Sequence, residues 1–222
     1  MLAKSLISEK IPAVKSDALG VEILNIMEVN EVSYIPCIEN NIFLGLIFKN
    51  EITKYSLENK AIKNFNFPLI KQFVYDDQHI FEVIEKFVKL SLQAIAVFNR
   101  DNEYFGIIST ETLINGFSKL TSMQEPGALI VIEMNANNYS LHEISQIVEG
   151  NDAKILTLYI ETQAGSNTVE LTLKVNTTNL SPIMQAFERF NYSIKSTYFE
   201  DEQMNNFYMN RYDEFMHYIN IS

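Results

Sequence analysis

The sequence predicts a mixed α/β protein in two parts, a duplicated β-α-β-β-α module followed by a βαββαβ unit. The first observation is an internal repeat: Phe43-Leu44-Gly45-Leu46-Ile47 returns about sixty residues later as Tyr104-Phe105-Gly106-Ile107-Ile108. The second is the breaker Glu125-Pro126-Gly127, after which the pattern changes. The third is the alternation of apolar and polar residues beyond that breaker, which is typical of half-buried strands.

The first copy of the module starts after an extended stretch that contains Pro12. Asp17 is expected to cap a helix, and short strands are expected at residues 33–38 and 42–48. Asn50 is expected to cap the closing helix. The buried face of the first helix is predicted from Leu19, Ile23, Ile26 and Met27.

The second copy repeats this order, and Val74 and Asp77 correspond to Val14 and Asp17 of the first copy. Asp77 is expected to cap a helix, and strands are expected at residues 94–98 and 104–108. The helix after Asp77 has apolar residues at helical spacing, namely Ile80, Val83, Ile84 and Phe87. The closing helix is predicted from Leu113, Ile114 and Phe117.

The second part begins with a strand over residues 128–134. Ser140 and Glu143 have the spacing of a capping box, in which the serine oxygen and the glutamate each satisfy a backbone N–H. The helix that follows is predicted to bury Leu141, Ile144, Ile147 and Val148. Strands at 154–161 and 169–175, a helix from Ser181-Pro182 and a strand at 192–199 complete the order βαββαβ, which is the ferredoxin-like arrangement.

The duplicated module resembles the pair of cystathionine-β-synthase (CBS) domains, over roughly residues 1–120. A ferredoxin-like unit after a CBS pair looks like an ACT-type regulatory domain, and this layout resembles the acetoin-utilisation family of regulatory proteins. The expected boundaries are 1–62 and 63–122 for the CBS repeats, 127–200 for the ACT-like domain and 201–222 for an amphipathic C-terminal helix.

In ligand-binding CBS domains a Gly-x-x-Thr/Ser-x-x-Asp motif ends the second repeat strand, where the hydroxyl meets phosphate and the carboxylate accepts from ribose hydroxyls. The second copy has Ser109 at the hydroxyl position and Thr112 at the position of the acid. The first copy has Phe48 at the hydroxyl position and Glu51 at the position of the acid. Neither copy is complete.

The resemblance implies an adenine nucleotide (AMP, ADP or ATP) as a regulatory ligand, with Glu51 or Glu111 serving the ribose and Lys49 a phosphate. The alternative is that both stretches are helix N-termini, where these residues suit capping and the helix dipole. The candidate ligand-binding residues are Lys49, Glu51, Ser109, Thr110, Glu111 and Thr112, with Ile35, Pro36, Ile95 and Ala96 on the repeated strands.

ACT domains that bind amino acids usually present Asp-x-Pro-Gly at the first loop–helix junction. Residues 137–141 read Asn-Asn-Tyr-Ser-Leu and lack both the proline and the glycine. A pairing role through a sheet edge or a helix face is therefore expected for this unit, in place of amino-acid binding.

Charge and composition exclude several classes of function. The formal net charge is −11, and residues 121–222 carry five Lys/Arg against 13 Asp/Glu. Without a basic face, DNA or RNA binding is not expected. No run approaches the ~20 apolar residues that span a bilayer, the N-terminus lacks a signal-peptide core, and a single Cys37 cannot form an internal disulfide. The cytoplasm is the expected location, without membrane attachment.

Catalytic and metal-binding patterns are absent from the sequence. His79, His142 and His217 have no metal-ligand spacing and are expected to be surface or capping residues. Cys37 lies in a predicted buried strand, where a thiol is usually an inert apolar group. No phosphate-binding glycine loop or nucleophile motif occurs.

The sequence therefore predicts a non-enzymatic regulatory protein without a metal, with the ACT-like domain responding to ligand binding in the CBS pair. The resemblance also implies a homodimer, which would suit Leu113, Ile114, Phe117 and the C-terminal helix, and an unidentified protein target. Two alternatives stay open: a structural interaction module without a small-molecule ligand, and a small enzyme with an unrecognised site, which would need a concave cluster of titratable groups.

Overall fold

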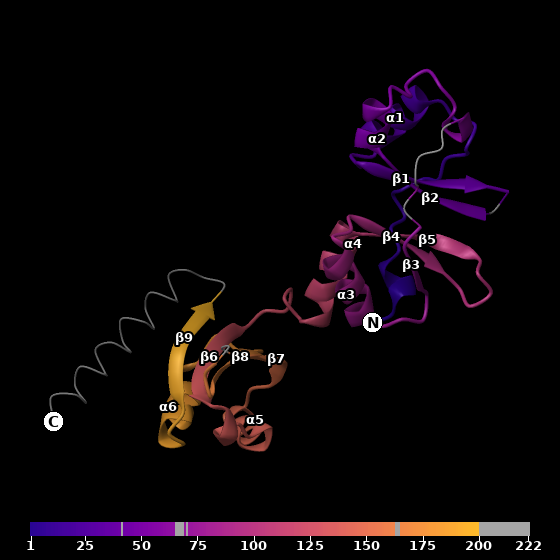
Figure 1. Ribbon diagram of the computed structural model, residues 1–222. Coiled ribbons are helices and arrows are strands. Elements are labelled where there is room, and N and C mark those ends of the chain that lie inside the picture. Colours follow the sequence, from indigo (N-terminus) through magenta and orange to yellow (C-terminus); the bar gives the residue numbers. More distant parts are fainter. Residues whose placement is uncertain (41, 65–68, 70, 163–164, 200–222) are drawn as a thin grey trace. The chain divides into compact units, whose positions relative to one another are not determined.

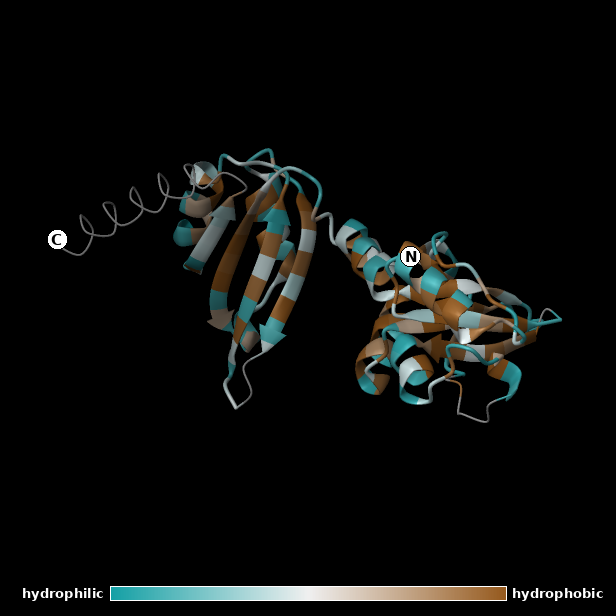
Figure 2. Cartoon of the chain, turned by 90° about the horizontal axis from the view of Figure 1, so that it is seen from above, coloured by the Kyte–Doolittle hydropathy of each residue, from teal (hydrophilic) through white to brown (hydrophobic). Residues whose placement is uncertain are grey.

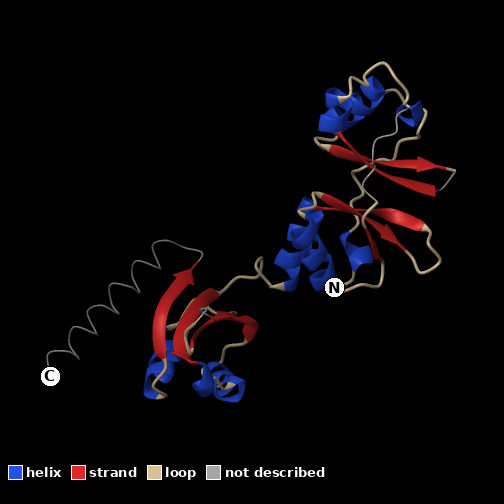
Figure 3. Cartoon of the chain, in the orientation of Figure 1, coloured by secondary structure: helices blue, strands red, loops and turns tan. Residues whose placement is uncertain are grey.

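The computed structural model describes residues 1–40, 42–64, 69, 71–162 and 165–199 of the chain. The chain divides into two compact units, the first spanning Met1–Leu120 and the second starting at Thr121. Both units combine helices with sheets, so the predicted mixed α/β class is confirmed (Figures 1 and 3). The predicted C-terminal helix at 201–222 lies outside the described residues.

The first unit contains two modules with the same order of elements. The first module comprises α1 (Gly20–Val29), β1 (Tyr34–Glu39), β2 (Ile42–Phe48) and α2 (Lys49–Lys54). The second module comprises β3 (Phe73–Tyr75), α3 (Ile80–Leu90), β4 (Ala94–Phe98), β5 (Tyr104–Ser109) and α4 (Thr110–Leu120). The parallel pairing of Val74 with Val97 in the second module matches a single parallel bridge between Val14 and Cys37 in the first.

The repeated glycine motif forms the same irregular hairpin in both modules. Cys37 pairs with Gly45 and Val97 pairs with Gly106, and the register shifts immediately afterwards in each hairpin. Both glycines have positive φ angles, 146° and 155°, which residues with a Cβ rarely adopt. The repeat that the sequence shows is therefore a repeated β-bulge that bends each hairpin.

The helix caps differ from the prediction. Asp17, Asn50 and Asp77 are not the N-caps; those positions belong to Leu19, Phe48 and His79. In each case a glutamate three residues later accepts the backbone N–H of the N-cap residue, through Glu22 (2.9 Å), Glu51 (3.2 Å) and Glu82 (3.0 Å). The N-caps of α1 and α3 therefore lie two residues after the predicted aspartates, and that of α2 lies two residues before the predicted Asn50, because the third-position carboxylate supplies the cap.

The first residues of the chain complete the second module. A short 3-10 helix, η1 (Ala3–Leu6), buries Ala3 and Leu6 among the core residues of β3, β4, β5, α3 and α4. Its backbone is held by hydrogen bonds from Ala3 N to Gln78 O (2.9 Å) and from Lys4 N to Asp76 O (3.1 Å). Residues 8–11 thus cross from the second module to the first.

The two modules meet through equivalent positions of their sheets, with α1 and α2 on one side and α3 and α4 on the other (Figures 1 and 3). Phe43 and Tyr104, which occupy the same place in the repeat, stack at 5.4 Å with parallel rings. The buried residues that share this contact are Tyr34, Leu46, Ala94, Ala96 and Ile107. The contact is therefore close to twofold symmetric in sequence as well as in space.

The second unit has the βαββαβ order that the sequence predicts. Its elements are β6 (Ala128–Asn135), η3 (Ala136–Asn138), α5 (Leu141–Glu149), β7 (Ile155–Thr162), β8 (Thr168–Val175), α6 (Ser181–Arg189) and β9 (Ser193–Phe199). The strands form one antiparallel sheet in the order β7-β8-β6-β9. This is the ferredoxin-like arrangement, with the inserted strand β8 between β6 and β7.

One side of this sheet packs against α5 and α6, and the strands alternate in hydropathy accordingly (Figure 2). Ser140 is the N-cap of α5 and accepts from Glu143 N at 3.3 Å, as predicted. The glutamate half of the predicted capping box differs, because the Glu143 carboxylate accepts from the Tyr192 hydroxyl at 2.6 Å. The prediction that Leu141 is buried is wrong, because this first helical residue is 52% exposed and its position turns away from the sheet.

The segment that opens the second unit is fixed to the other side of the sheet. Lys174 is only 9% exposed, and its ammonium donates to the carbonyl oxygens of Ser122 (2.9 Å) and Met123 (3.0 Å). Thr157 donates to the carbonyl of Thr121. A buried ammonium needs such partners, since an unpaired charge in the interior is costly. Within the described part of the chain, no helix is long and apolar enough to cross a membrane.

Candidate functional site

A cleft of about 970 Å³ opens between the two modules of the first unit. Four parts of the chain line it: the crossing segment at 8–11, the end of α1 with the loop to β1, Gln93 before β4, and the end of β5 with the start of α4. The lining residues are Ser8, Glu9, Lys10, Ile11, Val29, Asn30, Glu31, Val32, Ser33, Tyr34, Gln93, Ser109, Thr110 and Glu111. This volume is in the range of small-molecule sites.

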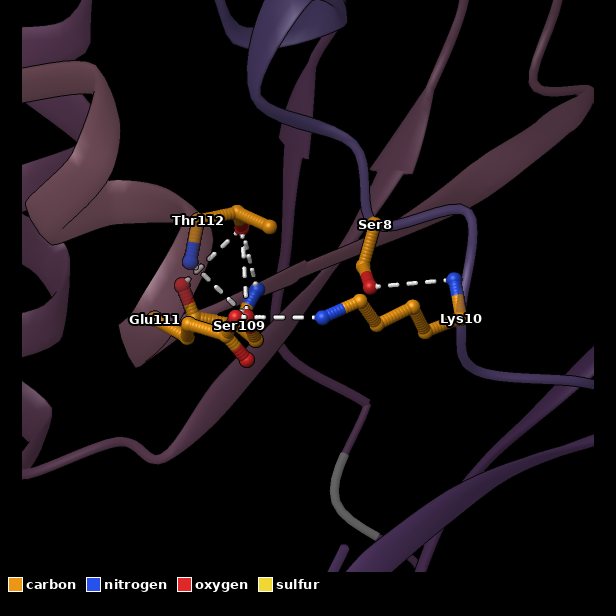
Figure 4. A network of polar contacts seen from close by, with 5 residues as sticks. All are labelled: Ser8, Lys10, Ser109, Glu111 and Thr112. Carbon is orange, nitrogen blue, oxygen red and sulfur yellow. Dashed lines mark hydrogen bonds and ion pairs between the residues drawn. The ribbon is translucent and has the colours of Figure 1, made fainter. Parts of the chain in front are cut away.

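Ser109 and Thr112 cap each other at the start of α4. Thr112 N donates to Ser109 Oγ at 3.0 Å, and Ser109 N donates to Thr112 Oγ1 at 3.0 Å. The two hydroxyls also lie 3.2 Å apart (Figure 4). Thr112, at the place of the motif's aspartate, therefore acts as a helix cap and fixes the orientation of the Ser109 hydroxyl at the cleft.

Lys10 reaches from the crossing segment at residues 8–11 toward the start of α4 (Figure 4). Its ammonium lies 3.4 Å from Glu111 Oε1, and the two side chains are 75% and 66% exposed. An exposed ion pair of this kind contributes about 0–1 kcal/mol, so it separates readily. Lys10 can therefore turn to another anion in the cleft at little cost.

Tyr34 is a buried aromatic residue of the lining, 7% exposed at the start of β1. Its burial raises the pKa of the phenol, a hydrogen bond with the Ser109 side chain lowers it, and the Glu111 charge raises it further. The phenol is therefore neutral near pH 7 and can both donate and accept a hydrogen bond. Tyr34 connects the first module to the Ser109 position of the second.

The other predicted site residues lie elsewhere. Lys49 and Glu51 are not among the lining residues, and Glu51 accepts the Phe48 backbone N–H as the cap of α2. The predicted strand residues are buried in the interior of the sheets, namely Ile35, Pro36, Ile95 and Ala96. Of the predicted set, Ser109, Thr110 and Glu111 line the cleft and Thr112 orients Ser109 from behind.

Sequence reasoning missed the residues that the first module and the crossing segment bring to the cleft. Lys10, Asn30, Glu31 and Tyr34 are far from Ser109 in sequence and belong to no motif. The only signal is the internal repeat, since a symmetric pairing of the modules would place Tyr34 opposite the end of β5. The other lining residues follow from how the N-terminal segment folds onto the second module.

The described residues contain no group of three or more His, Cys, Asp and Glu side chains that could hold a metal ion. His79 is the N-cap of α3, with Nδ1 accepting from Phe81 N at 3.4 Å, in line with the predicted capping role. Cys37 is fully buried, and burial with the nearby Glu39 charge raises its pKa to about 11. Its thiol is therefore protonated at neutral pH and unreactive.

A comparison with protein families finds a match in the second module: residues 68–119 match the family model of the CBS domain. The first module has the same elements and the same bulge. The match and the duplication together support a CBS-domain pair in the first unit.

Solved structures with a similar fold include a CBS domain pair/ACT domain protein from Thermotoga maritima, at 18% identity and a TM-score of 0.47, covering 54% of this chain and 98% of that chain. Another is a CBS domain-containing protein of unknown function from Bacillus anthracis, at 17% identity and a TM-score of 0.47, covering 54% and 94%. A third is CBSX2 in complex with AMP, at 14% identity and a TM-score of 0.46, covering 53% and 96%.

Proposed function

We propose that this chain is a non-enzymatic regulatory protein whose CBS pair binds an adenine nucleotide in the cleft between its modules. One observation carries the proposal. The cleft brings the hydroxyl of a Gly-x-x-Ser motif, in the segment that matches the CBS family model, together with a lysine, a carboxylate and a tyrosine. CBS domains are commonly regulatory and nucleotide-binding. This set of groups therefore fits nucleotide binding better than catalysis.

The side chains offer a partner for each part of a nucleotide. Ser109 and Lys10 are the donors for a phosphate group, since a hydroxyl and an ammonium both hydrogen-bond to phosphate oxygens. Glu111, once separated from Lys10, accepts from the ribose hydroxyls. Lys10 takes the phosphate role that the sequence suggests for Lys49, which lies outside the lining.

The backbone at the start of α4 is already engaged, so side chains supply the phosphate contacts. Thr110 N donates to Gln93 O at 3.2 Å, and Thr112 N donates to Ser109 Oγ at 3.0 Å. A phosphate at this helix end therefore does not gain the usual bonds from these two N–H groups. The Ser109 hydroxyl donates to Thr112 Oγ1 at 3.2 Å, so it would have to turn from Thr112 to reach a phosphate. Lys10 and Ser109 are the residues to test first.

Isothermal titration calorimetry with AMP, ADP and ATP tests the proposal. We expect binding to the unmodified protein and a loss of about tenfold in affinity for Ser109→Ala and for Lys10→Ala, because each removes a hydrogen bond to a charged group. Lys49→Ala is the matched control and should bind as the unmodified protein does. If none of the three nucleotides binds, the proposal fails and the structural-module alternative is favoured.

We also propose that the second unit is an ACT-like domain that responds to the ligand. The support is the path of the chain: α4 begins at the cleft and ends at Leu120, and the next residues are fixed to the second unit's sheet by Lys174 and Thr157. A ligand can shift the equilibrium between two conformations of the protein only by as much as its affinities for the two conformations differ.

Hydrogen exchange of residues 121–127 with and without AMP tests this response. We expect the nucleotide to change the exchange of this segment in the unmodified protein, and the change to be weaker in Lys174→Met, which cannot donate to the two carbonyls. Equal exchange with and without AMP in a protein that binds AMP would contradict the response but leave nucleotide binding intact.

Homodimerisation is the remaining part of the proposal. Of the residues predicted for this contact, Leu113 is buried in the core of the second module at 6% exposure, so it does not serve a dimer contact. Exposed apolar residues on the helices of the second module support the proposal: Ile114 is 62% exposed, and Phe81 and Val88 on α3 are 58% and 75% exposed. Apolar side chains of this size on adjacent helices suit contact with a second copy. Light scattering should give the dimer mass for the unmodified protein and a smaller mass for Ile114→Glu; a monomer mass for the unmodified protein would contradict the dimer.

A further inference from the structure

We infer that the cleft selects against ligands with more than one phosphate group, and that Glu9 and Glu31 are the residues that set this preference. The inference rests on the proposed function, because it concerns which nucleotide the same cleft prefers. It comes from the charges of the lining, which belong to this chain and not to the repeated motif.

The charged lining residues are three carboxylates and one ammonium: Glu9, Glu31 and Glu111 against Lys10. Three negative charges and one positive charge give the lining a formal charge of −2 at neutral pH. Lys10 is already paired with Glu111 at 3.4 Å. Glu9 and Glu31 therefore remain as two negative charges that the lining itself does not balance.

These two carboxylates reach the cleft from different segments. Glu9 lies in the crossing segment beside Lys10, and Glu31 lies in the loop between α1 and β1, where its φ angle of 53° is left-handed. Both residues are exposed, so they affect a ligand through space and are not needed to bury apolar surface. Replacing them should change the electrostatic potential of the cleft without changing the fold.

The remaining lining suits a ligand rich in hydroxyl and amide-like groups. Neutral polar side chains outnumber the charged ones, with Ser8, Asn30, Ser33, Tyr34, Gln93, Ser109 and Thr110 at the surface of the cleft. One ammonium offsets only part of the charge of one terminal phosphate, which is about −1.5 to −2 at pH 7. A second or third phosphate would add negative charge that meets only the carboxylates.

The expected preference follows from the charge of each nucleotide. A terminal phosphate carries about −1.5 to −2 charge at pH 7, and each additional phosphate adds about one negative charge. Two like charges several ångströms apart in water repel with an energy that changes affinity by about two- to threefold. The repulsion between two further phosphates and two unbalanced carboxylates should therefore lower the affinity for ATP by about tenfold relative to that for AMP at low salt.

The test is calorimetric titration of the full chain with AMP, ADP and ATP, in buffer with EDTA so that no divalent cation masks the phosphates. We expect the affinity order AMP, ADP, ATP for the unmodified protein. In the double variant Glu9→Gln, Glu31→Gln, we expect the ratio of AMP affinity to ATP affinity to fall by about tenfold, because ATP affinity rises more than AMP affinity does. Glu85→Gln, on the exposed side of α3, is the matched control and should keep the original ratio.

Salt provides a second readout. Raising the ionic strength from about 0.05 M to about 0.5 M should lower the ratio of AMP affinity to ATP affinity in the unmodified protein, because the screening length becomes shorter than the distances across the cleft. The same rise in ionic strength should have little effect on the ratio of AMP affinity to ATP affinity in the double variant.

The outcomes separate this inference from the function on which it rests. ATP binding as tightly as AMP, or a double variant with an unchanged ratio, would overturn the preference while nucleotide binding stands. No binding of any of the three nucleotides would instead overturn the proposed function, and the inference with it. A lower ratio of AMP affinity to ATP affinity in Glu85→Gln would show that the net charge of the protein, and not the cleft, sets the affinity order of the nucleotides. That result would also overturn the inference.

Discussion

The two modules of the first unit have the same framework and different groups at the end of the hairpin. In both, a buried strand pairs with a strand that contains a glycine bulge, and a helix follows at once. In the first module Tyr34 pairs with Phe48, whose rings lie 6.1 Å apart. In the second module the same pair is Ala94 and Ser109. One position of the repeat thus carries an aromatic ring in one copy and a hydroxyl in the other.

The difference shows which parts of the repeat serve the fold and which serve the site. The glycines and the buried aliphatic residues appear in both copies because the bulge and the sheet contact need them. The capping residue three positions after the hairpin differs, Glu51 in one copy and Thr112 in the other, yet both accept the backbone N–H at the end of the hairpin. Ser109 places a small polar group at this position and lines the cleft of about 970 Å³, whereas its counterpart Phe48 is not among the lining residues of that cleft.

The largest expected effect on stability comes from a position where the two modules carry side chains of different size. Gly20 starts α1, and the equivalent residue of α3 is the fully buried Ile80. A Cβ at Gly20 would overlap the backbone carbonyl of Leu57, which cannot rotate away. Gly20→Ala should therefore lower the free energy of unfolding by about 2–3 kcal/mol, measured by urea denaturation.

Ile80→Ala is the counterpart in the second module. It removes buried methyl groups and should cost a similar amount, about 2–4 kcal/mol, through a cavity. If Gly20→Ala unfolds at the same urea concentration as the unmodified protein, the close approach of α1 to Leu57 is not as the structure has it.

The second effect concerns the site. Ser109→Phe makes the second hairpin resemble the first and fills the cleft beside Tyr34. We expect AMP affinity to fall by at least about a hundredfold, which corresponds to about 2.7 kcal/mol, in calorimetric titration. Because a large residue at a 5% exposed position can disturb folding, circular dichroism and Ser109→Ala accompany it.

Phe48→Ser is the reciprocal change and the control for the role of the hairpin end. It removes an aromatic ring that packs against Tyr34, with ring centroids 6.1 Å apart, but is not itself among the lining residues of the cleft. AMP affinity in this variant should stay within about threefold of the unmodified protein. A loss of binding as large as that of Ser109→Phe would mean that the two modules do not differ in function as proposed.

A third effect is the pH dependence of stability. The equivalent residues Cys37 and Val97 both pair with the bulge glycines, but only the thiol titrates, and burial raises its pKa to about 11. The folded state keeps the thiol protonated after the unfolded chain, with a pKa of about 8.5–9, has lost the proton. This contribution to stability is therefore complete below about pH 8.5 and is lost as the pH rises to about 11.

Cys37→Val, which copies the second module, should remove that contribution. Between about pH 8 and pH 10.5 the unmodified protein should lose about 1–2 kcal/mol more stability than the variant, measured by urea denaturation at both pH values. Tyr34, Tyr104 and Tyr192 also have raised pKa values but are present in both proteins. Equal losses in the two proteins would contradict the assignment to Cys37.

The smallest effect concerns the caps. Glu51→Ala and Thr112→Ala each leave a backbone N–H without its cap, and each should cost about 1 kcal/mol in the free energy of unfolding. The two differ in ligand binding: Thr112→Ala should also weaken AMP by a few fold, because Thr112 orients Ser109, whereas Glu51→Ala should not. Equal AMP affinity in both variants would remove the positioning role of Thr112.

Much of the fold could be predicted because its determinants are local. The bulge glycines and the alternating apolar residues of β6 and β8 are visible in the sequence, and strand β4 matches its predicted range. The caps of α1, α2 and α3 could not be predicted from the aspartates and asparagine nearby, because the capping oxygen belongs to a glutamate one turn into the helix. An apolar residue such as Leu19 then suffices at the N-cap position.

The site was predictable only where a motif marks it. Ser109 and Glu111 follow from the Gly-x-x-Ser pattern, whereas Lys10 and Glu31 enter the cleft through the path of the N-terminal segment and the pairing of the modules. Those contacts span about a hundred residues of sequence and leave no local pattern. The assignment of a phosphate contact to Lys49 came from its place in the motif, which carries no information about this long-range packing.

The central claim is that one module end, the one with Ser109, makes the binding site. The most direct test is the stoichiometry of AMP binding to the unmodified full chain, measured by calorimetry at a protein concentration well above the dissociation constant. The account predicts one AMP per chain, with the heat lost in Ser109→Phe and kept in Phe48→Ser. Two AMP per chain, or binding that persists in Ser109→Phe and disappears in Phe48→Ser, would contradict it.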